Sequence, residues 1–245
     1  MRTGSPRTYS ALRRVYYEGL RVAEWHLFGS KLQELRWRMH RVYEDSHGDP
    51  HRAFLTERIG RFAPFESILE VGCSCGSNLV ALALAYPDVK LYGVDISAKA
   101  IRAARRTLAR KAAAGPAALF VRRADDLHGF LDKSVDIVLT DATLMYVGPD
   151  RIAATVAELA RVARKTLVLN EWHLFQPHCA QRAFWHYYHW VYDFPVVLGA
   201  VPGVKAVRVE PLPGGLFGPG GGWETYGALI EVELCSQRPA EPSQT

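Results

Sequence analysis

Residues 68–79 read ILEVGCSCGSNL, and this stretch decides the fold that we expect for the rest of the chain. An apolar run with one acid, Glu70, passes directly into small residues and ends at Ser77 and Asn78. That order predicts a strand, a tight turn and the start of a helix. Small residues in such a turn let a ligand approach the backbone, and the first N–H groups of the helix have no partner within the helix. The stretch therefore predicts a ligand site at the end of a strand.

The glycine spacing excludes two common kinds of phosphate loop. The pattern is Glu-x-Gly-x-x-x-Gly, with Gly72 and Gly76. It is not the Gly-x-Gly-x-x-Gly of dinucleotide enzymes, and it lacks the Gly-Lys-Ser/Thr of a P-loop. Cys73 and Cys75 supply only half the ligands of a structural zinc site. We interpret them as small residues that fill a tight turn, with a redox or metal role as the alternatives.

The flanking sequence alternates between short apolar runs and helical patterns. Such alternation predicts crossover units and a parallel sheet. Further along, 204–212 and 225–234 predict two strands on either side of a Gly-rich connection. The expected strands of the first part are 67–71, 91–96, 119–123, 135–140 and 166–171, and the expected helices lie near 77–86, 98–114 and 150–164.

The ends of the chain differ from this pattern. Residues 1–65 predict a helical N-terminal extension, with a restart at Asp49 and Pro50, residue types that favour the cap and first position of a helix. We expect that last helix to turn Phe54, Leu55, Ile59 and Phe62 inward. Residues 66–235 form the expected main domain, and the polar, Pro-containing tail 236–245 predicts disorder.

The composition of the chain and its lack of long apolar runs indicate the cellular compartment that we expect. The chain has 245 residues, 49% of them hydrophobic, which is enough for one substantial core. No apolar run approaches the roughly 20 residues that span a bilayer, and the N-terminus lacks a signal-peptide core. The four cysteines are too few for a disulfide framework. We therefore expect a cytoplasmic protein without a membrane segment.

Two acids follow the second and third strands. Asp95, in LYGVDIS, lies at the end of the second strand, 19 residues after Gly76, where a carboxylate can accept both hydroxyls of a ribose. Asp125, in VRRADDL, could receive the amino group of an adenine. Together with the turn, these acids predict a nucleoside ligand.

The set ILEVGCSCGSNL, LYGVDIS, RRADDL and VDIVLTDATLMYVGPD resembles the class I S-adenosylmethionine-dependent methyltransferases over about residues 66–172. The resemblance implies a Rossmann-like, doubly wound α/β fold whose seven-stranded sheet has an antiparallel last strand. It implies S-adenosyl-L-methionine as the cofactor. One departure is Ser74, which stands where the family's turn has its middle glycine.

The resemblance also implies roles for individual residues. Glu70, Gly72 and Gly76 would shape the methionine pocket, Asp95 would hold the ribose, and Asp125 with Leu127 would border the adenine. The full set expected at the cofactor comprises Glu70, Gly72, Cys73, Gly76, Asn78, Asp95, Ile96, Asp125, Asp126, Leu127 and Asp141.

The acceptor is expected beyond the fourth and fifth strands, because ligands lie at the carboxyl ends of such sheets. The candidate catalytic residues there are Tyr146, His173 and His189. Imidazole can act as a base near neutral pH. Asp141 is either a pocket carboxylate or a turn residue. The stretch 176–195 is rich in aromatic residues and histidine, and predicts either an acceptor pocket or a helix that packs on the sheet; its spacing matches no metal motif.

These features favour an enzyme that methylates a hydroxyl or amine of a small molecule, in specialised biosynthesis, with the N-terminal helices as a lid. The alternatives are an RNA or protein methyltransferase, a non-catalytic S-adenosylmethionine-binding module and a nicotinamide oxidoreductase. The basic run on 99–111 supports a nucleic-acid partner, but no Asn/Asp-Pro-Pro-Tyr follows the fourth strand, so nucleic acid is not the expected partner. A homodimer through the N-terminal helices is left open.

Overall fold

The computed structural model describes residues 46–111, 117–176, 183–186, 189–217 and 222–235. The chain divides into two compact units, Met1–Tyr43 and Glu44–Thr245, and all described residues belong to the second. The expected lid within the N-terminal extension and the expected disordered tail 236–245 therefore lie outside the described residues, apart from the segment 46–65.

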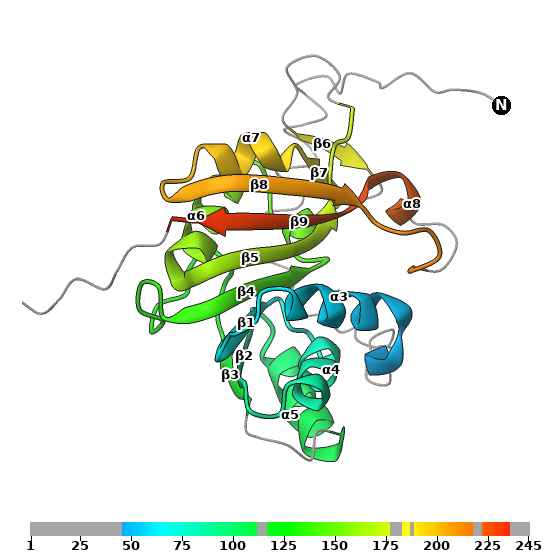
Figure 1. Cartoon of the computed structure of the whole chain (residues 1–245), viewed down its shortest axis with the longest axis vertical. Helices are drawn as coiled ribbons and strands as arrows, with labels where there is room; N and C mark the ends of the chain where they lie inside the picture. Colours follow the sequence, from blue (N-terminus) through cyan, green and yellow to red (C-terminus); the bar gives the residue numbers. More distant parts are fainter. Residues whose placement is uncertain (1–45, 112–116, 177–182, 187–188, 218–221, 236–245) are drawn as a thin grey trace, which may run out of the picture. The chain divides into compact units, whose positions relative to one another are not determined.

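A seven-stranded sheet forms the centre of the second unit, in the order β3-β2-β1-β4-β5-β9-β8 (Figure 1). Neighbouring strands from β3 to β5 are parallel, and β9 is antiparallel to both β5 and β8. This confirms the predicted sheet and its antiparallel last strand. The strands are β1 (Ser67–Val71), β2 (Lys90–Asp95), β3 (Ala118–Val121), β4 (Val135–Asp141), β5 (Ala163–Trp172), β8 (Val204–Pro211) and β9 (Gly227–Leu234).

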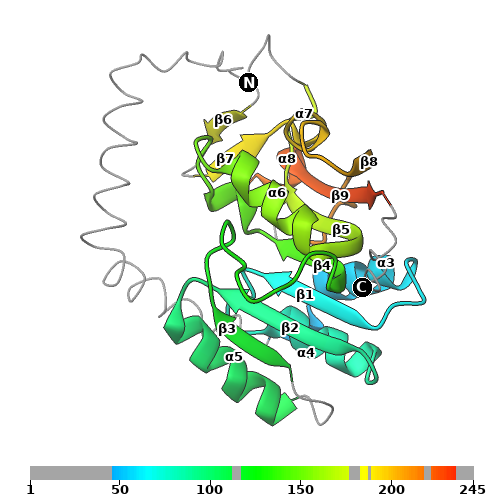
Figure 2. The same cartoon turned by 90° about the vertical axis from the view of Figure 1, so that its left-hand side faces the viewer.

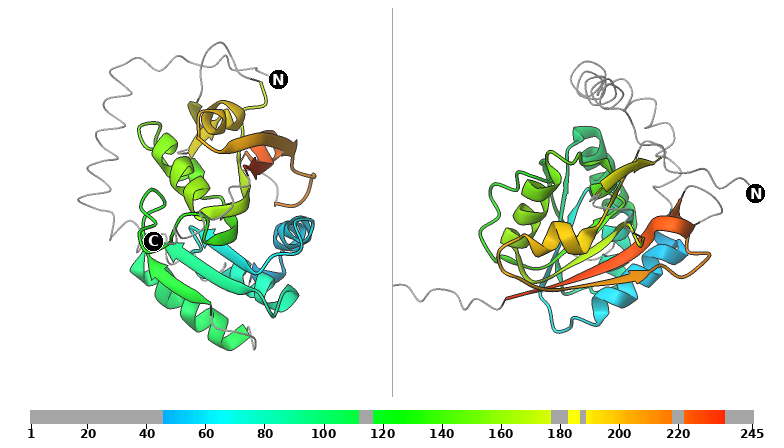
Figure 3. Two further views of the ribbon diagram at one scale, coloured as in Figure 1. Left: turned by 60° about the vertical axis from the view of Figure 1, so that its left-hand side comes forward. Right: turned by 90° about the horizontal axis from the view of Figure 1, so that it is seen from above.

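Helices cover both faces of the sheet (Figures 2 and 3). One buried cluster joins apolar residues of α3 (Pro50–Gly60), α4 (Ser77–Ala85) and α5 (Ala98–Lys111) to one face. A second cluster joins α6 (Ile152–Val162) and α7 (Phe194–Gly199) to the other. The strands of β1 and β4 are buried almost throughout, as expected of a sheet packed on both sides. The result is a three-layer α/β/α arrangement.

Helix α3 packs into this unit. It begins at Pro50 after the cap residue Asp49, as predicted. Leu55 and Ile59 are buried, and Phe54 packs against them as a partly buried residue. Near the other end, Arg58 donates to Glu231 on β9 at 2.9 Å. The last helix of the predicted extension is thus part of the sheet's core.

The aromatic stretch after β5 forms a hairpin of β6 (Ala183–His186) and β7 (His189–Tyr192), followed by α7. For the described residues 183–186 and 189–192 the helical alternative is therefore wrong, because each of them pairs with a residue of the opposite strand. Asp193 accepts the backbone N–H of Val196 at the start of α7.

Each helix among the described residues is too short or too polar to cross a membrane. The remaining short elements are η2 (Ser46–Gly48), η3 (Leu144–Tyr146) and α8 (Trp223–Tyr226).

Candidate functional site

The turn after β1 is held tightly against the neighbouring strands. The backbone N–H groups of Gly72 and Cys73 both donate to the carbonyl oxygen of Val94, at 2.8 and 2.9 Å. Gly72 has φ +81°, and a Cβ there would lie 2.1 Å from Thr143 Oγ1. Ser74 has φ 46°, so it adopts the left-handed conformation that glycine accepts more easily. Ser74 thus adopts, at some conformational cost, a backbone conformation that a glycine at this position would adopt freely.

The two cysteines of the turn are buried, each with 2% of its surface exposed. Cys73 lies beneath the turn, with its Sγ 3.0 Å from the position a Cβ would take on Gly93. Burial raises the pKa of its thiol. Within the described ranges, no three His, Cys, Asp or Glu side chains are grouped as a metal would require. These contacts agree with a packing role for both cysteines.

Asp95 joins the end of β2 to the turn. Its Oδ2 accepts the N–H of Ser74 at 3.0 Å, and its Oδ1 accepts the N–H of Ser97 at 2.8 Å. Burial raises its pKa, against the effect of these two hydrogen bonds. The next residue, Ile96, is 42% exposed. Both therefore lie at the carboxyl edge of the sheet beside the turn.

The three predicted cofactor residues after β3, which are Asp125, Asp126 and Leu127, differ in their burial and in their contacts. Asp125 accepts from Arg123 at 2.9 Å and pairs with Arg151, so both of its oxygens already contact guanidinium groups. Asp126 is exposed and pairs with His128. Leu127 is fully buried. Of these three, only Leu127 forms part of the apolar core.

A buried polar cluster lies where α3, α4, β1 and β4 meet. Asn78 Nδ2 donates to Glu70 Oε1 at 2.7 Å and to Asp141 Oδ2 at 3.0 Å. Asn170 Nδ2 donates to the other oxygen of Asp141 at 2.7 Å. Arg52 Nη1 donates to Asn78 Oδ1 at 2.5 Å. We call this set, together with His51, the polar cluster; its members are His51, Arg52, Glu70, Asn78, Asp141 and Asn170.

Glu171 fixes the loop after β4. Its Oε1 accepts the N–H groups of Thr143 and Leu144, each at 2.9 Å, and its Oε2 accepts that of Met145 at 3.3 Å. The carboxyl group is fully buried, and burial raises its pKa to about 7. Ala142, at the start of the loop, has φ 53°. The end of β5 thus determines the path of the segment that carries Tyr146.

The structure brings two of the three candidate catalytic residues together. Tyr146 is 41% exposed, and its ring centroid lies 4.9 Å from that of His189. His173 is buried against Phe194 of α7, and its Nδ1 accepts that residue's N–H at 3.4 Å. Burial lowers the pKa of His173. Among the described residues, the ring contacts of His173 are with Phe175 and Phe194, whereas Tyr146 and His189 contact each other.

Residues 68–166 match the family model of a methyltransferase domain. By sequence, this segment is therefore a methyltransferase domain. The fold of the chain is similar to a methyltransferase from Methanosarcina mazei, at 21% identity and TM-score 0.58, over 73% of this chain and 97% of that one. No curated protein sequence matches it significantly.

Two further solved structures have the same fold. The magnesium protoporphyrin IX methyltransferase of Synechocystis, solved with S-adenosylhomocysteine, shares 18% identity at TM-score 0.59, over 87% of this chain and 97% of that one. A geranyl diphosphate methyltransferase, solved with geranyl diphosphate and sinefungin, shares 19% identity at TM-score 0.56, over 75% and 77% of the two chains. At these identities the likeness establishes the shared fold.

The polar cluster has the chemistry to hold the amino-acid end of S-adenosylmethionine. Glu70 Oε2 and Asn170 Oδ1 are buried and lack a hydrogen-bond partner among the described residues. Both atoms are acceptors, so they suit a ligand with N–H donors. The guanidinium of Arg52 supplies N–H donors to the same cluster, which suits a carboxylate. An α-amino acid carries both groups.

Aromatic rings extend from the polar cluster to Tyr146. His51 stacks on Phe217 at 4.5 Å, and Phe217 stacks on Trp223 at 4.0 Å. Trp172 continues the series, with ring centroids 6.0 Å from Trp223 and 5.0 Å from His189. We call the series the aromatic wall; it comprises His51, Phe217, Trp223, Trp172, His189 and Tyr146. It joins α3, the β8–β9 connection, β5, β7 and η3.

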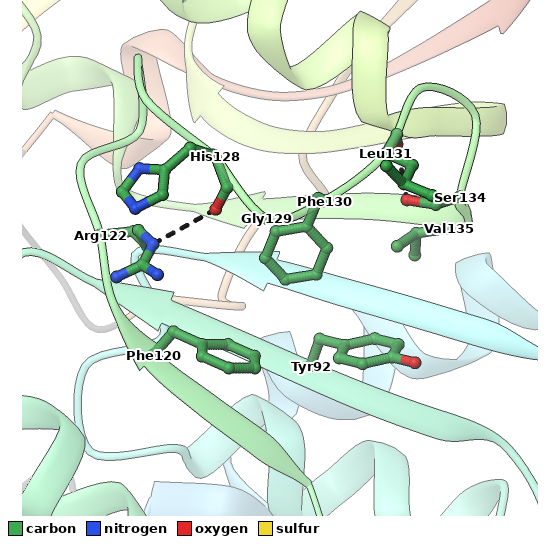
Figure 4. Close-up of a pocket in the computed structure, with 9 residues that line it drawn as sticks. All are labelled: Tyr92, Phe120, Arg122, His128, Gly129, Phe130, Leu131, Ser134 and Val135. Carbon is green, nitrogen blue, oxygen red and sulfur yellow. Dashed lines mark hydrogen bonds between the residues drawn. The ribbon is translucent and has the colours of Figure 1, made fainter.

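A separate cavity of about 280 Å³ opens on the sheet beside β2 and β3 (Figure 4). Phe130 lies across it, with ring centroids 5.7 Å from Tyr92 and 5.8 Å from Phe120. At one end Arg122 Nε donates to the carbonyl oxygen of His128 at 3.3 Å. None of the predicted site residues lines this cavity, so we assign it no part in the chemistry.

Sequence reasoning missed His51 and Arg52. The sequence predicted these two residues only as part of a helix that begins at Pro50. In the structure they are 8% and 7% exposed and belong to the polar cluster. It also missed Glu171 as the residue that binds the loop after β4. For His51 and Arg52, the sequence offered one indication, namely two adjacent polar residues on the first turn of the helix.

Proposed function

We propose that this methyltransferase transfers the methyl group of S-adenosylmethionine to a hydroxyl or amine of a small molecule. The observation that carries the proposal is the aromatic wall, which begins at the polar cluster and ends at the Tyr146–His189 pair. Aromatic side chains with a few polar groups are typical of small-ligand sites. A role in specialised biosynthesis is part of the same proposal.

The bound cofactor would supply an electrophilic methyl group on a sulfonium centre. The turn with Gly72 and Gly76 would shape the pocket for its methionine part, and Asp95 with Ile96 would hold its nucleoside part. The polar cluster would hold its amino-acid part. Rigid placement of this kind contributes much of the rate in a displacement reaction, because the reacting groups no longer have to find their orientation.

His189 and Tyr146 would act on the acceptor. An acceptor hydroxyl must lose its proton during transfer, and the His189 imidazole can take it near neutral pH. Tyr146, partly exposed beside that imidazole, would orient the acceptor. We assign no proton transfer to His173, since its Nδ1 already accepts a backbone hydrogen bond in a buried setting.

The similar folds include enzymes named for magnesium protoporphyrin IX and for geranyl diphosphate, both small molecules. They support the class of acceptor without identifying it. The competing function is methylation of RNA or protein, which the exposed arginines Arg102, Arg105 and Arg106 on α5 would serve.

Two measurements test the proposal. Calorimetry should show that S-adenosylhomocysteine binds the wild type and that Asp95→Ala weakens binding at least about tenfold, since the variant lacks the carboxylate expected at the ribose. Radiolabelled S-adenosylmethionine should then methylate members of a panel of phenols, alcohols and amines. Tyr146→Phe and His189→Gln should each reduce that transfer while leaving S-adenosylhomocysteine affinity unchanged. Label found in RNA or protein, and in no small molecule, would overturn the proposal.

A further inference from the structure

The polar cluster holds two buried carboxyl groups that share one amide. Asn78 Nδ2 donates to Glu70 at 2.7 Å and to Asp141 at 3.0 Å. Glu70 is 2% exposed, and the side chain of Asp141 is 8% exposed. A neutral amide cannot balance the charge of two carboxylates. The pair therefore needs positive charge from elsewhere to be ionised together.

The structure supplies one permanent cation to this pair. Arg52 Nη1 lies 3.6 Å from Asp141 Oδ2. His51 Nε2 is 3.7 Å from the same oxygen, but burial lowers the pKa of His51, so the imidazole is mainly neutral at pH 7. Within the described residues, the cluster thus has one fixed positive charge for two carboxyl groups.

The other titratable groups around the cluster do not correct this imbalance. Asp95 on β2, Glu171 on β5 and Asp49 before α3 are acids, and the thiol of Cys73 in the turn is neutral because burial raises its pKa. Glu70 is also the carboxyl group with a buried, unpartnered oxygen. A proton on Glu70 is the simplest way to complete the charge balance in the absence of ligand.

We propose that Glu70 carries a proton in the ligand-free protein, and that a ligand with an α-amino acid end displaces it, its ammonium group binding Glu70 Oε2 while its carboxylate binds Arg52. The proton leaves to solvent, and no covalent bond other than the carboxyl O–H changes. The proposal rests on the proposed use of S-adenosylmethionine, whose methionine part carries both groups. Burial raises the pKa of Glu70 to about 8, which agrees with a protonated carboxyl group at neutral pH.

Two ligands separate the amino-acid end from the nucleoside. S-adenosylhomocysteine has the α-ammonium and α-carboxylate groups, whereas 5′-methylthioadenosine has the same nucleoside and thioether without them. Calorimetry at pH 7 in buffers of different ionisation enthalpy counts the protons released on binding. We expect about one proton per S-adenosylhomocysteine and none per 5′-methylthioadenosine. The affinity for S-adenosylhomocysteine alone should rise close to tenfold per pH unit between about pH 6 and 7.5.

Variants assign the proton and the carboxylate contact. Glu70→Gln has the shape of the protonated side chain, so it should fold, release no proton and lose the pH dependence of affinity. Arg52→Met should weaken S-adenosylhomocysteine binding roughly 10- to 100-fold, as expected for a lost charge-assisted contact, and change 5′-methylthioadenosine binding less than about twofold. Arg61→Met is the matched control, because Arg61 directly follows the same helix but is exposed and, among the described residues, forms its ion pair with Glu57.

The outcomes are distinct. If neither ligand binds folded wild type, the proposed function fails and this inference fails with it. If S-adenosylhomocysteine binds without releasing a proton, or the wild type and Glu70→Gln release the same number, the inference alone fails. If Arg52→Met weakens both ligands equally, Arg52 supports the fold of the site and does not bind the carboxylate. The wild-type comparison of the two ligands needs no variant, so misfolding of a variant does not prevent the test.

Discussion

The variant Glu171→Gln tests which of two opposing effects determines the pKa of Glu171, the most deeply buried carboxyl group at the candidate active site. Three backbone N–H groups donate to Glu171, and such bonds lower a carboxyl pKa, in favourable cases below about 2. Complete burial acts in the opposite direction, because it disfavours the charged form. Here burial is the larger effect and raises the pKa from 4.5 to about 7.

The consequence for stability has a definite sign. Because the folded-state pKa is above the unfolded one, the contribution of Glu171 to stability is complete below about pH 4.5 and is lost as the pH rises through about 7. One bound proton corresponds to about 1.4 kcal/mol per pH unit, so the loss between pH 5 and pH 8 is roughly 2–3 kcal/mol. Glutamine cannot ionise and resembles the protonated acid. The free energy of unfolding of the variant should therefore rise relative to that of the wild type, by roughly 2–3 kcal/mol, between pH 5 and pH 8.

Urea denaturation of both proteins at several pH values between 5 and 8 measures this difference. Glu70 and Asp95 are present in both proteins, so their own pH dependence cancels in the comparison. A difference in unfolding free energy that stays constant with pH would show that Glu171 does not change its protonation in this range. A wild type that gains stability over the variant as pH rises would show that the three hydrogen bonds outweigh burial, and the reasoning would be refuted.

Three further changes have clear expected results. Gly72→Ala should lower the melting temperature by about 5–10 °C in a thermal scan, because the new Cβ meets Thr143 and the left-handed backbone strains alanine; an unchanged value would contradict the packing of the turn. Arg58→Met should lower the free energy of unfolding by about 2 kcal/mol in urea, since it leaves Glu231 without its cation in a half-buried setting; a loss below about 0.5 kcal/mol would show that the pair contributes little. Asp125→Asn should change S-adenosylhomocysteine affinity less than about threefold by calorimetry, because arginines already occupy its oxygens, whereas a tenfold loss would support the predicted adenine contact.

The sheet could be predicted closely because each of its strands is a short apolar run between unambiguous helix and turn signals. Strand β1 begins and ends at the predicted residues, Ser67 and Val71, and α5 begins at the predicted residue, Ala98. The β6–β7 hairpin was harder to predict from the sequence. Its residues are aromatic and histidine-rich on both sides, so no alternation of polar and apolar residues distinguishes a strand from a helix.

The site was predictable where the chain itself brings residues together, and less so where distant segments meet. Glu70 and Asn78 lie on either side of one turn, and their hydrogen bond follows from that spacing. Arg52 reaches the same cluster from a helix that precedes β1, a contact that depends on how α3 packs. The exposure of Tyr146 and the burial of His173 likewise depend on the hairpin and α7, whose positions no local pattern specifies.

The position of β9 has a consequence for how the chain reaches its native state. This strand is the last of the seven in chain order, yet it lies between β5 and β8 (Figure 1). Until residues 227–234 arrive, β5 presents an unpaired edge that contains Leu167, Val168 and Leu169, and β8 has no strand to pair with. An open apolar edge is a template for association with other chains. Chains in which residues 227–234 are not yet made, or are deleted, should therefore depend on chaperones more than their otherwise local crossover topology would require.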